Sequence, residues 1–262
     1  MNIGIVGLGL IGGSMAKAIK AKTGHSVYGI DLNEETMLLA RLSGAMDAPL
    51  NEEELKNTDL VLLAIRPRAA IDWAEKNFDK LSAGAMCVDL CGVKRKVTEE
   101  IFELSQKHGV VYVGGHPMAG KEKGRFQNSD ENLYVGASMI LTPMKNTMPD
   151  TLEMLENLFT DIGFARVVFT SPDEHDRIIA YTSQLAHVVA NAYVKSPTAQ
   201  DHKCFTAGSF RDLTRVARLN PTMWTELFLD NADYLSAEIG FLIDSLSAYK
   251  DAIDAGDRKS VV

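Results

Sequence analysis

Cysteine is scarce in this chain of 262 residues, which has only three, Cys87, Cys91 and Cys204. An odd number of cysteines without the close spacing of metal ligands argues against both a disulfide framework and a zinc site. We therefore expect reduced thiols and no bound metal.

Positive charge is also scarce, because 27 lysines and arginines face 35 aspartates and glutamates, for a net charge of -8. A protein that binds nucleic acid or an anionic membrane surface needs a cationic face. The charge balance therefore argues against both kinds of partner. It also disfavours a DNA-binding regulator that senses a nicotinamide cofactor without turning it over.

Long apolar runs are missing as well. None approaches the roughly 18 uncharged residues of a membrane span, and glycines interrupt the N-terminal apolar segment where a signal peptide would be continuous. We expect a cytoplasmic protein. With 46% hydrophobic residues, the chain can bury a substantial core, and its length suggests two domains.

Short β-branched runs alternate with helical stretches over residues 1–170, and after Ser171 the strand pattern stops. Such alternation predicts an α/β domain of the Rossmann type with a parallel-rich sheet, followed by an all-α domain over residues 171–262. The expected strands are 2–6, 26–30, 60–64, 85–90, 110–113, 137–141 and 165–169.

The helical part opens with a capping box, Ser171-Pro172-Asp173-Glu174, which predicts a nearly straight helix of about seven turns ending before Pro197. Another helix should start at Asn220-Pro221. From there to residue 253 apolar residues recur at helical spacing, and they form more apolar surface than a small domain can cover. Since large exposed apolar patches mark interfaces, we expect a homodimer through this domain.

A glycine-rich turn follows the first expected strand immediately and opens a helix. In the sequence Gly7-Leu8-Gly9-Leu10-Ile11-Gly12, Gly7 permits the turn, Gly9 lets a diphosphate approach the backbone, and Gly12 allows close helix packing. The helix N-terminus, with Leu10 and Ile11, offers backbone N–H groups to the phosphates. We therefore expect a dinucleotide site.

Asp31 ends the second expected strand, where a carboxylate accepts hydrogen bonds from the hydroxyls of an adenine ribose and repels a 2′-phosphate. Neither Leu32 nor Asn33 supplies a cation for such a phosphate, so NAD is favoured over NADP. Arg66, after the run 60–64, is a candidate contact to the adenosine.

A histidine at the end of another expected strand is the candidate base. His116 follows the run 110–113 and stands between Gly114-Gly115 and Pro117. Proline restricts the residue before it to an extended conformation, and a strand end in Gly-Gly can bring the backbone close to a ligand. We expect this imidazole to act as a general base toward a substrate hydroxyl.

Several motifs together resemble the prephenate dehydrogenase family over nearly the whole chain. They are the glycine turn 7–12, the segment 116–120 (His-Pro-Met-Ala-Gly), the segment 183–187 (Ser-Gln-Leu-Ala-His) and the stretch from Arg215 to Trp224. The resemblance implies oxidative decarboxylation of prephenate to 4-hydroxyphenylpyruvate with hydride transfer to NAD, in tyrosine biosynthesis, by a dimer.

The same resemblance assigns roles to single residues. His116 would be the catalytic histidine, His187 and Arg215 would hold the substrate, and Ser183 and Gly208 would line its pocket. Arginine suits that role because its planar guanidinium can meet a carboxylate with two hydrogen bonds.

The chain departs from the family at two positions. Gly92 stands where members commonly carry a serine that assists the catalytic histidine, and Ala186 stands where proline is usual. Two alternative activities stay open: an arogenate dehydrogenase, and another two-domain β-hydroxyacid dehydrogenase. Members of the second class generally use a catalytic lysine in the helical region, and neither Lys195 nor Lys203 lies in a convincing motif.

Overall fold

Residues 1–121, 123–201 and 204–260 are described by a computed structural model of the chain. They divide into two units, Met1–His175 and Asp176–Val262. Helix α7 (Pro172–Ile179) spans the division.

Within the described residues, unit 1 is built on one eight-stranded sheet with the order β3-β2-β1-β4-β5-β6-β7-β8. Neighbouring strands are parallel except for β6 and β7, which are antiparallel, so β7 and β8 run against the other six. The strands are β1 (Asn2–Val6), β2 (Ser26–Ile30), β3 (Ala48–Pro49), β4 (Leu60–Leu63), β5 (Met86–Asp89), β6 (Val111–Pro117), β7 (Ser138–Pro143) and β8 (Arg166–Phe169).

The expected parallel-rich α/β fold is confirmed, and each of the seven expected runs contains a strand. Two details differ. Strand β3, a two-residue edge strand paired with β2, was not expected. The expected strand 110–113 is too short, since β6 continues to Pro117 because its last residues pair with β7.

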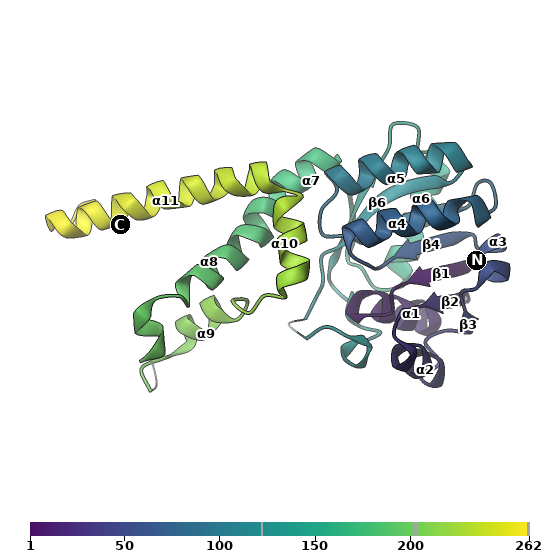
Figure 1. The fold of residues 1–262 in the computed structure, drawn as a ribbon, viewed down its shortest axis with the longest axis horizontal. Coiled ribbons are helices and arrows are strands. Elements are labelled where there is room, and N and C mark those ends of the chain that lie inside the picture. The colour runs from purple at the N-terminus through teal and green to yellow at the C-terminus, as the bar shows by residue number, and fades with distance from the viewer. Residues whose placement is uncertain (122, 202–203, 261–262) are drawn as a thin grey trace. The chain divides into compact units, whose positions relative to one another are not determined.

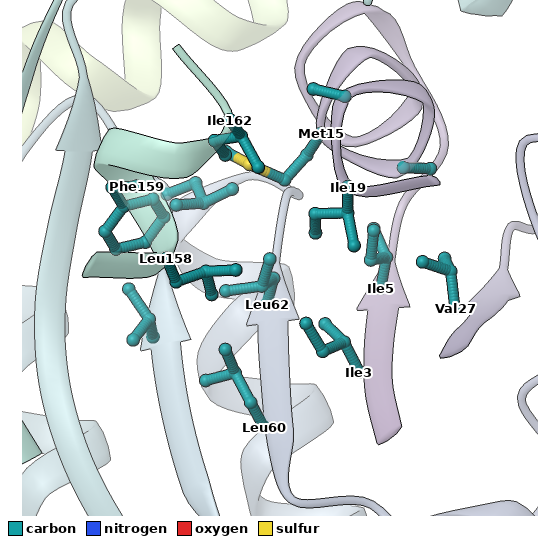
Figure 2. Close-up of a cluster of buried hydrophobic side chains, with 14 of the residues drawn as sticks. Ile3, Ile5, Met15, Ile19, Val27, Leu60, Leu62, Leu158, Phe159 and Ile162 are labelled. Atoms are coloured by element: carbon teal, nitrogen blue, oxygen red, sulfur yellow. The ribbon is translucent and has the colours of Figure 1, made fainter. Parts of the chain in front are cut away.

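Helices cover both faces of this sheet (Figure 1). Figure 2 shows Met15 and Ile19 of α1 and Leu158 and Phe159 of α6 over the side chains of β1 and β4, where they form a buried core. Helices α4 and α5 pack against each other over the other face. The helices of unit 1 are α1 (Leu10–Lys22), α2 (Glu34–Leu42), α3 (Glu52–Lys56), α4 (Pro67–Asn77), α5 (Arg95–His108) and α6 (Pro149–Asp161), with short 3-10 turns at Phe78–Lys80 and Phe126–Asn128.

Unit 2 is helical throughout the part that the structure describes. Its α-helices after α7 are α8 (Ala186–Tyr193), α9 (Gly208–Thr214), α10 (Pro221–Leu229) and α11 (Ala232–Ala255), and a 3-10 turn covers Pro197–Gln200. Asn220 caps α10 as expected, with its Oδ1 accepting the Met223 N–H at 3.1 Å. The all-α character expected for this part is confirmed.

The expected uniform helix of about seven turns is wrong in one respect. The Ser171 hydroxyl caps its start, accepting the Glu174 N–H at 3.1 Å, but a π-helical segment, η3 (Ala180–Leu185), separates α7 from α8. The end of α8 at Tyr193, before Pro197, is as expected. A π segment changes which side chains share a face, and such segments are frequent at functional sites.

A buried amide joins the start of unit 2 to its longest helix. Asn231, directly before α11 and fully buried, donates through Nδ2 to the Asp176 carbonyl at 2.9 Å and to Gln184 Oε1 at 2.8 Å. Gln184 in turn donates to the Leu227 carbonyl at 2.8 Å. These bonds satisfy polar groups that water cannot reach, and they fix α11 against the π segment.

Helix α11 exposes a row of large apolar side chains. Phe241, Leu246 and Ile253 are 67%, 57% and 62% exposed, and Leu229 just before the helix is 70% exposed. None of the described helices is long and apolar enough to cross a membrane.

We predict that Asn231→Ala lowers the free energy of unfolding by about 1–3 kcal/mol, because it leaves two buried oxygens with fewer donors. Urea unfolding measures the change. Asn157→Ala, at an exposed position on α6, is the matched control and should stay within about 0.5 kcal/mol of the parent. Equal stability of the two variants would contradict the structural role of the buried amide.

Candidate active site

The glycine turn between β1 and α1 has the geometry that its sequence requires. Gly7 adopts a positive φ of 87°, and a Cβ there would lie 2.7 Å from the Ala64 carbonyl oxygen. Gly12 is even more tightly placed, since its Cβ would lie 1.8 Å from the Gly7 oxygen. Both positions therefore exclude a side chain, which lets α1 start directly against β1 and β4.

Gly9 differs from those two glycines because a Cβ built on it meets nothing within 4 Å. It is the N-cap of α1. The first bond within the helix runs from Gly13 to the Gly9 carbonyl, at 3.0 Å, so the N–H groups of Leu10, Ile11 and Gly12 lie outside the helix's own ladder. Open space beside these donors fits the diphosphate of a dinucleotide.

Asp31 lies directly after β2 and faces this turn. One carboxylate oxygen accepts the Leu8 N–H at 2.7 Å and the other accepts the Asn33 N–H at 2.9 Å. Each oxygen retains a further lone pair for a ribose hydroxyl. Leu32 beside it is fully exposed. Arg66 is an exposed residue that precedes α4 after β4.

His116 lies in the last part of β6 and pairs with Ile140 of β7. The two glycines before it are needed for packing within the protein. A Cβ on Gly114 would lie 2.3 Å from Thr142 Oγ1, and one on Gly115 would lie 2.7 Å from the Asp89 carbonyl oxygen. We expected these two glycines to let a ligand approach the backbone. Their role in the structure is instead to let β5 and β7 pack closely against β6.

The side chain of His116 contacts a second histidine. His116 Nδ1 lies 2.9 Å from Nε2 of His175, and the two rings meet edge to face with centroids 5.1 Å apart. His175 is buried in α7, with 2% of its surface exposed. Burial, then His175 and then Lys94 lower the pKa of His116 well below its usual value, so this imidazole is neutral at pH 7.

A buried carboxylate lies on the same face of the sheet as His116. Asp89, at the end of β5, and Lys94, at the start of α5, are an ion pair with both side chains fully buried. The carboxylate also accepts the Tyr112 hydroxyl at 2.7 Å and the Cys91 N–H at 2.9 Å. Burial and the Asp89 charge raise the pKa of Tyr112 well above its usual value, so Tyr112 stays a hydrogen-bond donor.

In unit 2, His187 is held from two sides. Its Nδ1 lies 2.8 Å from the Ser183 carbonyl one turn earlier, and because a carbonyl only accepts, this nitrogen carries the proton. The ring lies against Trp224 of α10, with centroids 3.9 Å apart. Ser183 contacts His187 through its main-chain carbonyl and not through its hydroxyl. The other ring nitrogen of His187, Nε2, can bind a ligand.

Gly208 and Arg215 mark the two ends of α9: Gly208 is its first residue and Arg215 follows its last. Both are exposed, and α9 packs against α8, which carries His187. The structure thus brings four expected substrate residues, Ser183, His187, Gly208 and Arg215, onto neighbouring elements of unit 2. Their approach to His116 of unit 1 stays a prediction.

Three residues of the His116 neighbourhood were missed by the sequence analysis, namely His175, Lys94 and Tyr112. His175 directly follows the capping box 171–174, and nothing in the sequence assigned it a role. Lys94 had a detectable signal, since a lysine five residues after an aspartate at a strand end is in reach of that carboxylate. For His175 the signal lies in tertiary structure, because 59 residues separate it from His116.

Two family models match this chain. The nucleotide-binding domain of prephenate dehydrogenase matches residues 15–169, and its dimerization domain matches residues 171–262. The chain belongs to the prephenate dehydrogenase family. The glycine turn 7–12 precedes the first matched range, so its assignment depends on the geometry given above.

Similar proteins of known activity or structure are 26–32% identical to the chain over the aligned residues. The prephenate dehydrogenase of Bacillus subtilis is 30% identical over 98% of the chain and 71% of its own length. A crystal structure of Aquifex aeolicus prephenate dehydrogenase in complex with hydroxyphenyl propionate and NAD+ has a TM-score of 0.88 at 32% identity, and covers 100% of this chain and 93% of its own. Synechocystis arogenate dehydrogenase has a TM-score of 0.83 at 26% identity, with 100% and 95% covered.

Two glycine substitutions separate folding from cofactor binding. Gly12→Ala should lower the free energy of unfolding by about 1–3 kcal/mol, because its Cβ collides with the backbone. Gly9→Ala should leave stability within about 0.5 kcal/mol yet weaken NADH binding about tenfold or more, because the methyl group fills the space beside the helix N-terminus. Urea unfolding and NADH fluorescence measure the two effects. Unchanged NADH binding by Gly9→Ala would place the diphosphate elsewhere.

Removing one hydroxyl tests the buried carboxylate. Tyr112→Phe deletes a hydrogen bond to the charged Asp89, and we expect a loss of about 1.5–3 kcal/mol in the free energy of unfolding. The partly exposed Tyr28 of β2 provides the control, Tyr28→Phe, for which we expect a change within about 0.5 kcal/mol. A similar small effect at both positions would mean that Asp89 does not need the phenol.

Proposed function

We propose that this protein oxidises and decarboxylates prephenate to 4-hydroxyphenylpyruvate, with NAD as the hydride acceptor. The observation that carries the proposal is a partly buried imidazole, His116, at the end of β6 and hydrogen-bonded to His175, in a member of the prephenate dehydrogenase family. Prephenate is a cyclohexadienol with two carboxylates, so its oxidation requires a base for the hydroxyl proton and cations for the anionic groups.

His116 is the base in this proposal. Its neutral ring accepts the proton of the substrate hydroxyl as the hydride leaves the carbinol carbon. Loss of the ring carboxylate as CO2 then makes the ring aromatic, and the phenol oxygen of the product takes up a proton. The net reaction therefore converts prephenate and NAD+ into 4-hydroxyphenylpyruvate, CO2 and NADH, and a base with a pKa below 7 is ready at neutral pH.

The residues of the glycine turn fit NAD. Gly9 leaves space beside the N-terminus of α1, and Asp31 presents a carboxylate for the ribose hydroxyls that would repel a 2′-phosphate. When bound, NAD supplies the hydride acceptor. The match to the family's nucleotide-binding domain and the NAD+ in the Aquifex aeolicus complex support this cofactor. Leu10, Ile11 and Arg66 complete the proposed contacts.

Unit 2 supplies the substrate groups in this proposal. Arg215 binds a carboxylate of prephenate, and His187 contributes Nε2 while Trp224 holds its ring in place. Ser183 and Gly208 line the same pocket. The hydroxyphenyl propionate in the Aquifex aeolicus complex supports a site for a six-membered ring with a carboxylate side chain.

The functional form in this proposal is a homodimer that pairs through residues 171–262, with residues 1–170 as the cofactor domain. The match of residues 171–262 to the family's dimerization domain supports this assembly, as do the exposed apolar side chains of α11. A second chain would cover them.

Arogenate is the alternative substrate, and the likeness to Synechocystis arogenate dehydrogenase favours its inclusion in any test. Arogenate carries an ammonium group where prephenate has a keto group, so the two substrates differ in one charge. Family membership disfavours the other β-hydroxyacid dehydrogenases, and it disfavours a regulator that binds NAD without turnover.

Absorbance at 340 nm with each pairing of NAD or NADP and prephenate or arogenate tests the proposal. We expect NADH production with NAD and prephenate at a kcat/KM at least about tenfold above the other pairings. Faster turnover of arogenate would reverse the substrate assignment. NAD binding without turnover of either compound would contradict the enzymatic proposal.

His116→Asn should lower kcat about 100-fold or more and leave KM nearly unchanged, the usual effect of losing a positioned base. His108→Asn, on the far end of α5, is the matched control and should match the parent. Near-parental turnover by His116→Asn would remove the base assignment.

The acidic limb of kcat/KM gives a second test of the base. Because the pKa of His116 lies well below its usual value, and because the base must be deprotonated to act, kcat/KM should stay constant down to about pH 6.5 and fall only as the pH drops further. A limb centred at or above about pH 6.5 would contradict a neutral His116 as the base.

A further inference from the structure

We propose that His175 is a positioning residue that holds His116 in the tautomer with the proton on Nδ1, so that Nε2 is the basic nitrogen. This inference depends on the proposed function for the role of the base. The observation behind it is the hydrogen bond between His116 Nδ1 and His175 Nε2, at 2.9 Å.

The placement of His175 is rigid. It lies in the first turns of α7, where its own N–H donates to the Ser171 carbonyl at 3.0 Å, and only 2% of its surface is exposed. His116 is equally constrained by the strand pairing of β6 with β7. Because both backbones are fixed and His175 is buried, the 2.9 Å contact restricts the orientation of the His116 ring.

A hydrogen bond between two imidazole nitrogens requires a proton on one of them only. If His116 Nδ1 carries it, Nε2 of His116 has a lone pair and can accept the substrate proton. If His175 Nε2 carries it, a neutral His116 must hold its own proton on Nε2 and cannot act as a base there. Base catalysis by Nε2 therefore needs His175 as the acceptor.

No other residue that the structure describes makes a side-chain hydrogen bond to the His116 ring apart from His175. Gly92 has no side chain with which to do so. Lys94 is near enough to lower the pKa of His116, but its ammonium pairs with Asp89. His175 therefore orients the His116 ring, a role that no sequence motif predicted.

Two substitutions of His175 provide the test. In His175→Leu the side chain at position 175 offers no acceptor to His116 Nδ1, whereas in His175→Gln the side-chain amide oxygen lies near the position of Nε2 and can accept. We expect kcat to fall about 10–100-fold in His175→Leu with KM changed less than about twofold, and at least half of that loss on a logarithmic scale to be recovered in His175→Gln. His108→Gln is the matched control.

Nitrogen NMR of the full-length protein, labelled with 15N-histidine, tests the tautomer without any substrate. In the parent protein at pH 7.5, we expect His116 to show a protonated Nδ1 and an unprotonated Nε2, and in His175→Leu we expect the Nε2-protonated form or a mixture. Far-ultraviolet circular dichroism and urea unfolding identify a variant that fails to fold, in which case His175→Gln and the parent spectrum still decide.

The outcomes separate the two proposals. A parent protein that does not oxidise prephenate contradicts the proposed function, and its NMR spectrum still reports which nitrogen carries the proton. A parent protein that is active but has Nε2 protonated overturns the role of His175. So does a His175→Leu variant that is folded and has parental kcat.

Discussion

The fully buried carboxylate of Asp89 is the constraint on which the part of unit 1 around His116 depends. A lone carboxylate in such a place would be strongly unfavourable, and here an ammonium, a phenol and a backbone N–H surround it. Those partners come from the turn after β5, the start of α5 and strand β6. Satisfying one charge therefore holds together the turn after β5, the start of α5 and strand β6, which carries His116.

The same cluster shapes the chemistry of the histidine. Lys94 contributes positive charge near His116, and burial removes the water that would stabilise an imidazolium, so the ring remains neutral. Buried ion pairs contribute little to net stability. In this molecule the pair of Asp89 and Lys94 orders the end of the sheet and contributes to the electrostatic surroundings of His116, the proposed base.

Much of the fold was predictable because its signals are local. The glycine turn, the carboxylate of Asp31 after β2 and the strand before His116 are each written within a few residues, and the structure has them where the sequence indicated. Strand β3 was missed because two edge residues have no periodicity. The π segment around Ser183 was not predicted because no local sequence signal distinguishes it from an α-helix. Ala186, which directly follows it, provides no such signal either.

The site was only partly predictable, for a physical reason. His116 could be found because proline and glycine restrict its backbone, but its contact with His175 depends on how α7 packs against the sheet, and that is a tertiary event. The glycines before His116 were interpreted as space for a ligand, whereas Thr142 and the Asp89 carbonyl occupy that space. The sequence therefore indicates His116 as the candidate base, whereas the contact that orients its ring appears only in the structure.

A crystal structure of the protein with NAD+ and 4-hydroxyphenylpyruvate bound tests the central claim most directly. The account predicts the phenol oxygen of the ligand within hydrogen-bond distance of His116 Nε2, the ring carbon bearing it against the nicotinamide, and the ligand carboxylate at Arg215. A ligand whose carboxylate lies at His116, or whose phenol oxygen faces another base, would contradict it.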